Sequence, residues 1–170
     1  MATDLYSRLM NYAFNALSRR ALTEFEMRDK LLKRYAKIQG SSGSTSELSV
    51  DQDIIADVCS RLRELNLIND EKYLENFIST KTNLQAIGKF GVFNKLRGKG
   101  ISKEIFDRVW ESSDISESAI LDRACEDFER KKGAINGSQK QKERLMRYLA
   151  ARGLPPALIY KKIREGLQEE

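Results

Sequence analysis

Apolar residues recur along most of the chain at spacings of three and four, which is the repeat of one face of an α-helix. The first such face predicts a helix over residues 5–19, and its apolar members are Leu5, Leu9, Tyr12, Ala13 and Leu17. Thr23 with Glu26, and Ser138 with Gln141, match the capping-box pattern that opens a helix. Alternating patterns typical of strands are scarce. The sequence therefore predicts an all-α fold.

Part of this helical pattern occurs twice in the second half of the chain. Segment 92–110 aligns with segment 145–163 at an offset of 53 residues, and apolar or glycine residues coincide at seven positions. Each segment predicts a helix, then a turn closed by a glycine (Gly100 or Gly153), then another helix. The two segments are therefore expected to have the same local structure.

A weaker third copy begins at Met27 and places Tyr35 where the other copies have glycine. A Gly/Ser-rich insertion follows at 36–49 and predicts a flexible loop, after which a helix starts at Asp51 or its neighbours. A longer helix precedes each copy, over residues 5–19, 71–82 and 115–131. The chain is thus expected to form three tandem three-helix repeats in an elongated, curved body. The expected repeats span residues 1–68, 69–113 and 114–170.

Composition narrows the chemistry that we expect of such a fold. The chain has no histidine, which removes Ser/His/Asp and Cys/His triads and imidazole metal sites. Cys59 and Cys125 lie among apolar helical residues and are expected to be buried and unpaired. No window approaches the roughly 20 apolar residues that cross a bilayer, and the first residues do not resemble a secretory signal. We therefore expect a cytoplasmic protein that is not an enzyme and uses no membrane, metal or cofactor.

Charge alternates strongly along the sequence. Residues 79–103 contain six Lys or Arg and no Asp or Glu, whereas residues 104–129 contain nine Asp or Glu and two Arg. This pattern predicts a basic face that binds nucleic-acid phosphates and an acidic face for another partner. The predicted binding residues are Lys30, Arg34, Lys89, Lys95, Arg97, Lys99, Lys103, Arg144, Arg147 and Arg152.

Arg34, Lys99 and Arg152 occupy the same position in the three copies, at the end of the middle helix. Such cations either bind phosphate or simply interact favourably with the helix dipole, which is worth about 0.3 to 1 kcal/mol each. Helical spacing places Phe93 in the core, whereas Phe90 fits either the core or a base-stacking role.

Four segments follow one another in the order LSRRALTEFEMRDKL at 17–31, LRELNLIND at 62–70, NKLRGKGI at 94–101 and RYLAARGL at 147–154. This ordered set resembles the RecX family. The resemblance implies a modulator of the RecA recombinase, mostly inhibitory, that lies in the groove of the RecA filament. It implies contact with single- and double-stranded DNA, effects on the ATPase, strand-exchange and coprotease activities of RecA, and a place in recombination, repair and the SOS response. We expect the protein to act as a monomer.

Other interpretations of the sequence remain open. A helix-turn-helix DNA-binding regulator fits the helix pairs and positive charge, although the cations are spread over three repeats instead of one recognition helix. A protein-interaction scaffold would show no salt-dependent DNA binding. An enzyme is the weakest alternative. The glycines at 88 and 91 lack a preceding strand and a Gly-Lys-Ser/Thr ending, so they indicate flexible helix ends and not a phosphate loop.

Overall fold

The structure is a computed structural model that describes residues 2–39, 48–133 and 138–165. Within these ranges the secondary structure consists of nine α-helices, with no strand. This confirms the predicted all-α fold. The chain forms two compact units, described separately below. The first unit comprises Met1–Tyr73 with Gly98–Gly100, and the second comprises Leu74–Arg97 with Ile101–Glu170.

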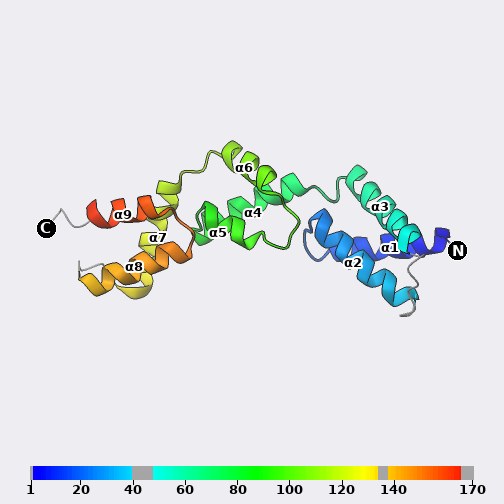
Figure 1. Cartoon of the computed structure of the whole chain (residues 1–170), viewed down its shortest axis with the longest axis horizontal. Coiled ribbons are helices and arrows are strands. Elements are labelled where there is room, and N and C mark those ends of the chain that lie inside the picture. The colour runs from blue at the N-terminus through cyan, green and yellow to red at the C-terminus, as the bar shows by residue number, and fades with distance from the viewer. Residues whose placement is uncertain (1, 40–47, 134–137, 166–170) are drawn as a thin grey trace. The chain divides into compact units, whose positions relative to one another are not determined.

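Three helices make up most of the first unit: α1 (Ala2–Leu17), α2 (Glu24–Gln39) and α3 (Leu48–Glu64). Each of the three packs against the other two, as Figure 1 shows. The apolar face predicted from the spacing of α1 turns inward, since Leu9 and Ala13 are fully buried. The remaining buried core residues of this unit are Met10, Leu22, Met27, Leu31, Tyr35, Ile55, Val58, Cys59, Leu62 and Ile68.

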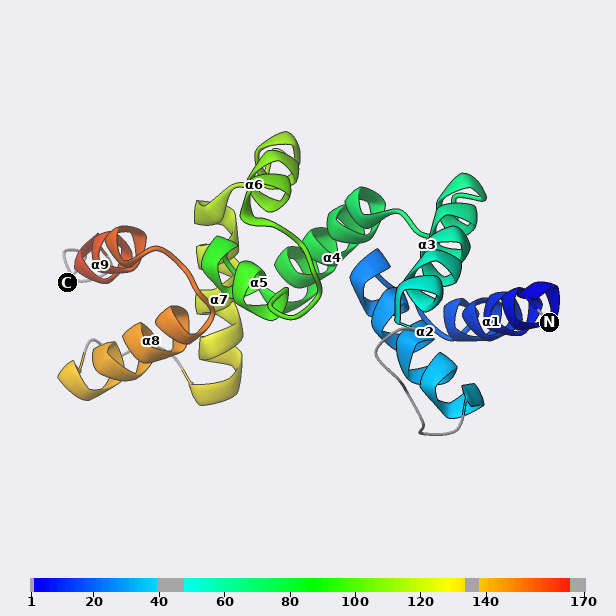
Figure 2. The same cartoon turned by 45° about the vertical axis from the view of Figure 1, so that its right-hand side comes forward.

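The second unit contains most of α4 and all later helices. Their bounds are α4 Asp70–Gln85, α5 Lys89–Lys95, α6 Lys103–Ser112, α7 Glu117–Lys132, α8 Gln139–Ala151 and α9 Pro156–Glu165. Helices α7, α8 and α9 pack together, and α5 packs against α6 (Figure 2). Pro156 is the first residue of α9, where a proline costs no helical hydrogen bond. The largest buried side chains of this unit include Leu74, Ile78, Val92, Phe106, Ile120 and Leu149.

The insertion in the first repeat differs from its prediction. Helix α2 continues to Gln39 and α3 already begins at Leu48, so the loop expected over 36–49 is too long at both ends. The reason is Tyr35, which is buried inside α2 and extends the helix instead of occupying a turn as glycine does in the other copies. The remainder of the expected loop, 40–47, lies outside the described residues.

The two predicted capping boxes have different outcomes. The Thr23 hydroxyl accepts a hydrogen bond from the Glu26 N–H, and the Glu26 carboxylate accepts one from the Thr23 N–H, both at 3.2 Å. This reciprocal pair confirms the first box. Ser138 occupies the N-cap of α8, but its side chain accepts no capping hydrogen bond there, so the part of the second box that Ser138 should supply does not form.

Each unit contains a hydrogen bond between the backbone of a glycine-closed turn and a residue just before a helix. In the first unit the Thr23 hydroxyl, just before α2, donates to the carbonyl oxygen of Lys99 at 2.7 Å. In the second unit the N–H of Gly88, just before α5, donates to the carbonyl oxygen of Arg152 at 3.0 Å. The residue after each carbonyl is a glycine with positive φ: Gly100 at +74° and Gly153 at +70°. A turn carbonyl that precedes a glycine with positive φ therefore accepts such a bond in both units, from a hydroxyl in the first and from a backbone N–H in the second.

Three features of the described part of the chain bear on the expected chemistry. Cys59 and Cys125 are buried and free, as predicted. No group of three His, Cys, Asp or Glu side chains in the described ranges is placed to hold a metal ion. In the same ranges, none of the helices combines the length and apolar character needed to cross a bilayer.

Candidate nucleic-acid interface

The predicted basic residues fall into two groups, those paired within the protein and those left exposed. Lys99 belongs to the first group. Its Nζ lies 2.9 Å from a carboxylate oxygen of Glu26 and 5.4 Å from the ring centre of Tyr73, and its side chain is 20% exposed. Arg20 contacts the same carboxylate at 3.2 Å. Lys99 therefore helps to hold the Gly98–Gly100 turn against the start of α2.

The pKa values of this pair reflect the contacts. Burial alone would raise the pKa of Glu26, but hydrogen bonds from Arg20, Lys99 and the Thr23 N–H outweigh burial and lower it. Burial would likewise lower the pKa of Lys99, but its contacts with Tyr73 and Glu26 raise it instead. Each charge stabilises the other.

Replacing Glu26 with glutamine is expected to lower the free energy of unfolding by about 1.5 kcal/mol at pH 7. Because the folded-state pKa of Glu26 is depressed, its carboxylate stabilises the fold above pH 4.5, its ordinary pKa, and the stabilisation is lost as the pH falls further. The difference between wild type and E26Q should therefore disappear in acid. Urea unfolding followed by far-UV circular dichroism at several pH values measures it.

Asp29→Asn is the matched control, because Asp29 pairs with Lys33 on the exposed face of the same helix at 2.6 Å. Exposed pairs of this kind contribute about 0.5 kcal/mol or less. A loss in E26Q that is no larger than in D29N, or that persists at low pH, would show that the Glu26 charge does not stabilise the turn.

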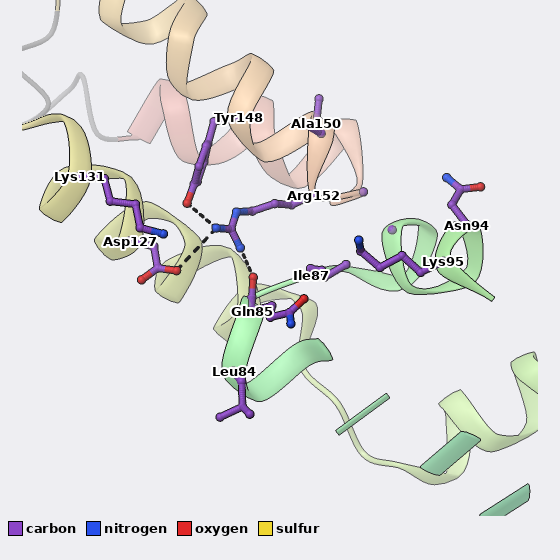
Figure 3. A pocket seen from close by; sticks show the side chains of 13 residues that line it. Leu84, Gln85, Ile87, Asn94, Lys95, Asp127, Lys131, Tyr148, Ala150 and Arg152 are labelled. Atoms are coloured by element: carbon purple, nitrogen blue, oxygen red, sulfur yellow. Dashed lines mark hydrogen bonds and ion pairs between the residues drawn. The ribbon is translucent and has the colours of Figure 1, made fainter. Parts of the chain in front are cut away.

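Arg152 is also engaged within the protein (Figure 3). Its guanidinium donates to the hydroxyl of Tyr148 and to the carbonyl oxygens of Gln85 and Ala86, and it lies 3.6 Å from Asp127. The side chain is 17% exposed and stacks 4.5 Å from the Tyr148 ring centre. Arg152 thus joins the end of α8 to α4 and α7.

The third member of this repeated position, Arg34, differs from the other two. It is exposed on α2, with its guanidinium 5.6 Å from the ring centre of Tyr12. Lys99 and Arg152, but not Arg34, therefore hold a turn against neighbouring helices. A phosphate-binding role for this position stays a prediction.

Lys89 and Lys103 converge on one carboxylate, that of Asp107. Lys89 lies 2.8 Å from it and is partly buried, whereas Lys103 is exposed and forms an i,i+4 pair with it. Hydrogen bonds from Lys103 and Lys89 lower the pKa of Asp107, and the bond to Asp107 raises the pKa of Lys103. Positive charge at these two positions is thus partly neutralised within the second unit.

The remaining predicted cations are more available to a ligand. In the described part of the chain, Lys95, Arg97 and Arg144 are exposed and have no carboxylate partner. Arg147 is exposed and donates from Nε to the Glu143 carbonyl at 3.3 Å. Lys30 is half-buried on α2. All of these cations therefore carry positive charge that no ion pair in the described part of the chain neutralises.

A groove of about 600 Å³ lies in the second unit, next to the Arg152 network (Figure 3). Lys95 and Asn94 of α5 line it, together with Lys131 of α7 and Leu84 of α4, whose side chain is 79% exposed. Lys131 and Asn94 were not among the predicted residues. The run of three cations at 130–132, in the last turn of α7, is the sequence signal that points to Lys131.

The structure places the two phenylalanines of α5 differently. Phe93 is partly buried, with its ring centre 5.1 Å from that of Phe106, which fits the predicted core position. Phe90 is 60% exposed, so the core alternative for it is wrong. Base stacking by Phe90 stays a prediction.

Comparison with known proteins identifies the family. No family model matches the chain. It is 32% identical to the regulatory protein RecX of Caldanaerobacter subterraneus over 103 residues, which cover 60% of the chain and 44% of that relative. It is 24% identical to the regulatory protein RecX of Amycolatopsis mediterranei over 168 residues, covering 98% of the chain and 87% of the relative. The crystal structure of RecX from Lactobacillus salivarius matches the fold with a TM-score of 0.72, at 22% identity and 99% coverage of both chains. The chain therefore belongs to the RecX family of regulatory proteins.

Proposed function

We propose that this protein binds the RecA filament assembled on DNA and modulates, mostly inhibits, its ATPase, strand-exchange and coprotease activities. It would act as a cytoplasmic monomer in recombination, repair and the SOS response. Support comes from the regulatory RecX proteins among its relatives and from the four sequence segments that resemble that family.

The observation that carries the DNA-binding part of the proposal is the set of exposed, unpaired cations in the second unit. Lys95 and Arg97 follow one another closely at the end of α5, and Arg144 and Arg147 lie one turn apart on α8. Each cation that contacts a phosphate releases condensed counterions, so binding should weaken as salt is raised. Lys99 and Arg152 contribute mainly to the fold in this proposal.

Acidic side chains would contact RecA itself. Residues 104–129 carry most of the negative charge of the second unit, and Glu104, Glu111, Glu126 and Glu129 are all exposed there. Exposed carboxylates steer association with a basic surface and suppress contact with DNA phosphates. The separation of basic and acidic segments thus fits a protein that contacts DNA and RecA together.

Adding the purified protein to RecA on single-stranded DNA tests the proposal directly. ATP hydrolysis and mean filament length are both expected to fall as the protein is added. If neither changes, the proposed function is wrong. Tight binding to one duplex sequence, without any effect on RecA, would instead favour an autonomous helix-turn-helix regulator.

A further inference from the structure

A hollow of about 630 Å³ lies in the first unit between α1, α2 and the connection that joins them. None of the residues that line it belongs to the cation-rich segment at 79–103. Its size is within the range of about 300 to 1,000 Å³ that is typical of small-ligand sites. The residues that line it are Tyr12, Asn15, Ala16, Arg19, Arg20, Leu22 and Lys30, with no Asp or Glu among them.

The three cations of this hollow are not equally neutralised. Arg20 lies 3.2 Å from the carboxylate of Glu26. Arg19 and Lys30 have no carboxylate partner in the described part of the chain. Arg34 adds further positive charge beside the wall, because its guanidinium lies over the ring of Tyr12. Like charges held around one concave surface repel one another, and a bound anion would relieve that repulsion.

Helix electrostatics alone do not explain the arrangement. Arg19 and Arg20 follow the C-terminal end of α1, where the helix dipole favours cations. Lys30, however, comes from the second turn of a different helix, α2, and still faces the same hollow. Cations from two elements therefore converge on this hollow, although the dipole of α1 accounts only for Arg19 and Arg20.

We propose that this hollow binds a phosphate group, with Arg19 and Lys30 as its charged donors. Arginine matches phosphate oxygens with a planar fork of N–H donors, and lysine supplies a compact positive charge. Tyr12 and Asn15 bring neutral hydrogen-bonding groups to the same lining. The phosphate belongs either to a nucleic-acid strand or to a free nucleotide or related anion. The nucleic-acid source rests on the proposed function, whereas the phosphate site itself does not.

The test removes both unpaired charges in the variant R19Q/K30Q. Its matched control is R28Q/R61Q, which removes the same charge from exposed positions of the first unit that do not line the hollow. One probe is a labelled oligothymidylate, followed by fluorescence anisotropy over a range of salt concentrations. The other is inorganic pyrophosphate, followed by the rise in melting temperature that it causes. Circular dichroism checks that both variants are folded.

We expect R19Q/K30Q to bind the oligonucleotide about 5- to 10-fold more weakly, with a salt-dependence slope smaller by about 1.4, the value for two lost single-strand phosphate contacts. The control should change affinity by less than about 2-fold. Loss of oligonucleotide affinity assigns the hollow to a nucleic-acid strand, and loss of pyrophosphate stabilisation alone assigns it to a free anion. If R19Q/K30Q matches the control with both probes, the proposal is overturned.

These measurements use no RecA, so their outcome is independent of the proposed function. If wild-type protein binds phosphate in the hollow but leaves ATP hydrolysis by RecA unchanged, the phosphate site is retained and the filament role is ruled out. If wild-type protein inhibits RecA but R19Q/K30Q matches R28Q/R61Q with both probes, the filament role is retained and the phosphate site is ruled out.

Discussion

Replacing Gly153 with alanine is expected to destabilise the second unit by about 3 kcal/mol or more. Gly153 has a φ of +70°, and a Cβ atom there would lie 2.0 Å from the backbone nitrogen of Gly91 and 2.5 Å from its Cα. Backbone atoms cannot rotate away as the end of a side chain can. The turn after α8 must therefore separate from α5, and the hydrogen bond from Gly88 to Arg152 would be lost with it.

Gly98→Ala separates the steric part of this effect from the conformational part. Gly98 also has a positive φ, +78°, but a Cβ atom there would meet nothing within 4 Å. Its replacement should cost only the left-handed backbone strain of a non-glycine residue, about 1 to 2 kcal/mol. Thermal and urea unfolding followed by far-UV circular dichroism compares the two variants. Gly98 belongs to the first unit, so Trp110, the only tryptophan, reports on the second unit that G153A affects and not on the site of G98A. Equal losses in G153A and G98A would contradict the close contact.

The glycine-closed turns show how far the sequence could predict this fold. Helical spacing and the internal alignment located Gly100 and Gly153 at turns after the middle helices, and both have the positive φ that such turns need. Their tertiary contacts were not predictable in this way. The glycine at 91 was interpreted as a flexible helix end, yet a Cβ there would lie 2.3 Å from the Arg152 carbonyl oxygen. Glycine selected for close backbone approach and glycine selected for flexibility look alike in a single sequence.

The candidate interface was predicted less completely, because charge pairing over long sequence distances leaves no local pattern. Lys99 and Lys95 are near neighbours in one basic segment, but Lys99 pairs with Glu26 of a helix far earlier in the chain. Arg152 similarly reaches Asp127 on α7. The cluster of cations at 79–103 was visible from composition. Which members remain available to a ligand became apparent only from the fold.

Reversing the charge of Lys95 and Arg97 together, as K95E/R97E, is expected to raise the concentration needed for half-maximal inhibition of RecA ATP hydrolysis by about 10- to 100-fold. Both side chains are exposed and unpaired in the described part of the chain, so the change places negative charge against DNA phosphates without breaking an ion pair. Lys99 is left unchanged, because a carboxylate there would face Glu26 and destabilise the first unit. The measurement is a titration of each variant into RecA on single-stranded DNA.

K140E/R164E is the matched control, because it makes the same change in net charge at two exposed positions of the second unit that were not predicted to bind. If the effect arises from contacts at the end of α5, the control should inhibit RecA within about 3-fold of wild type, and raising salt should weaken wild type more than K95E/R97E. Equal loss in both variants would indicate a general effect of net charge. Unchanged inhibition by K95E/R97E would remove Lys95 and Arg97 from the mechanism and leave the α8 cations, Arg144 and Arg147, as the next residues of the second unit to reverse.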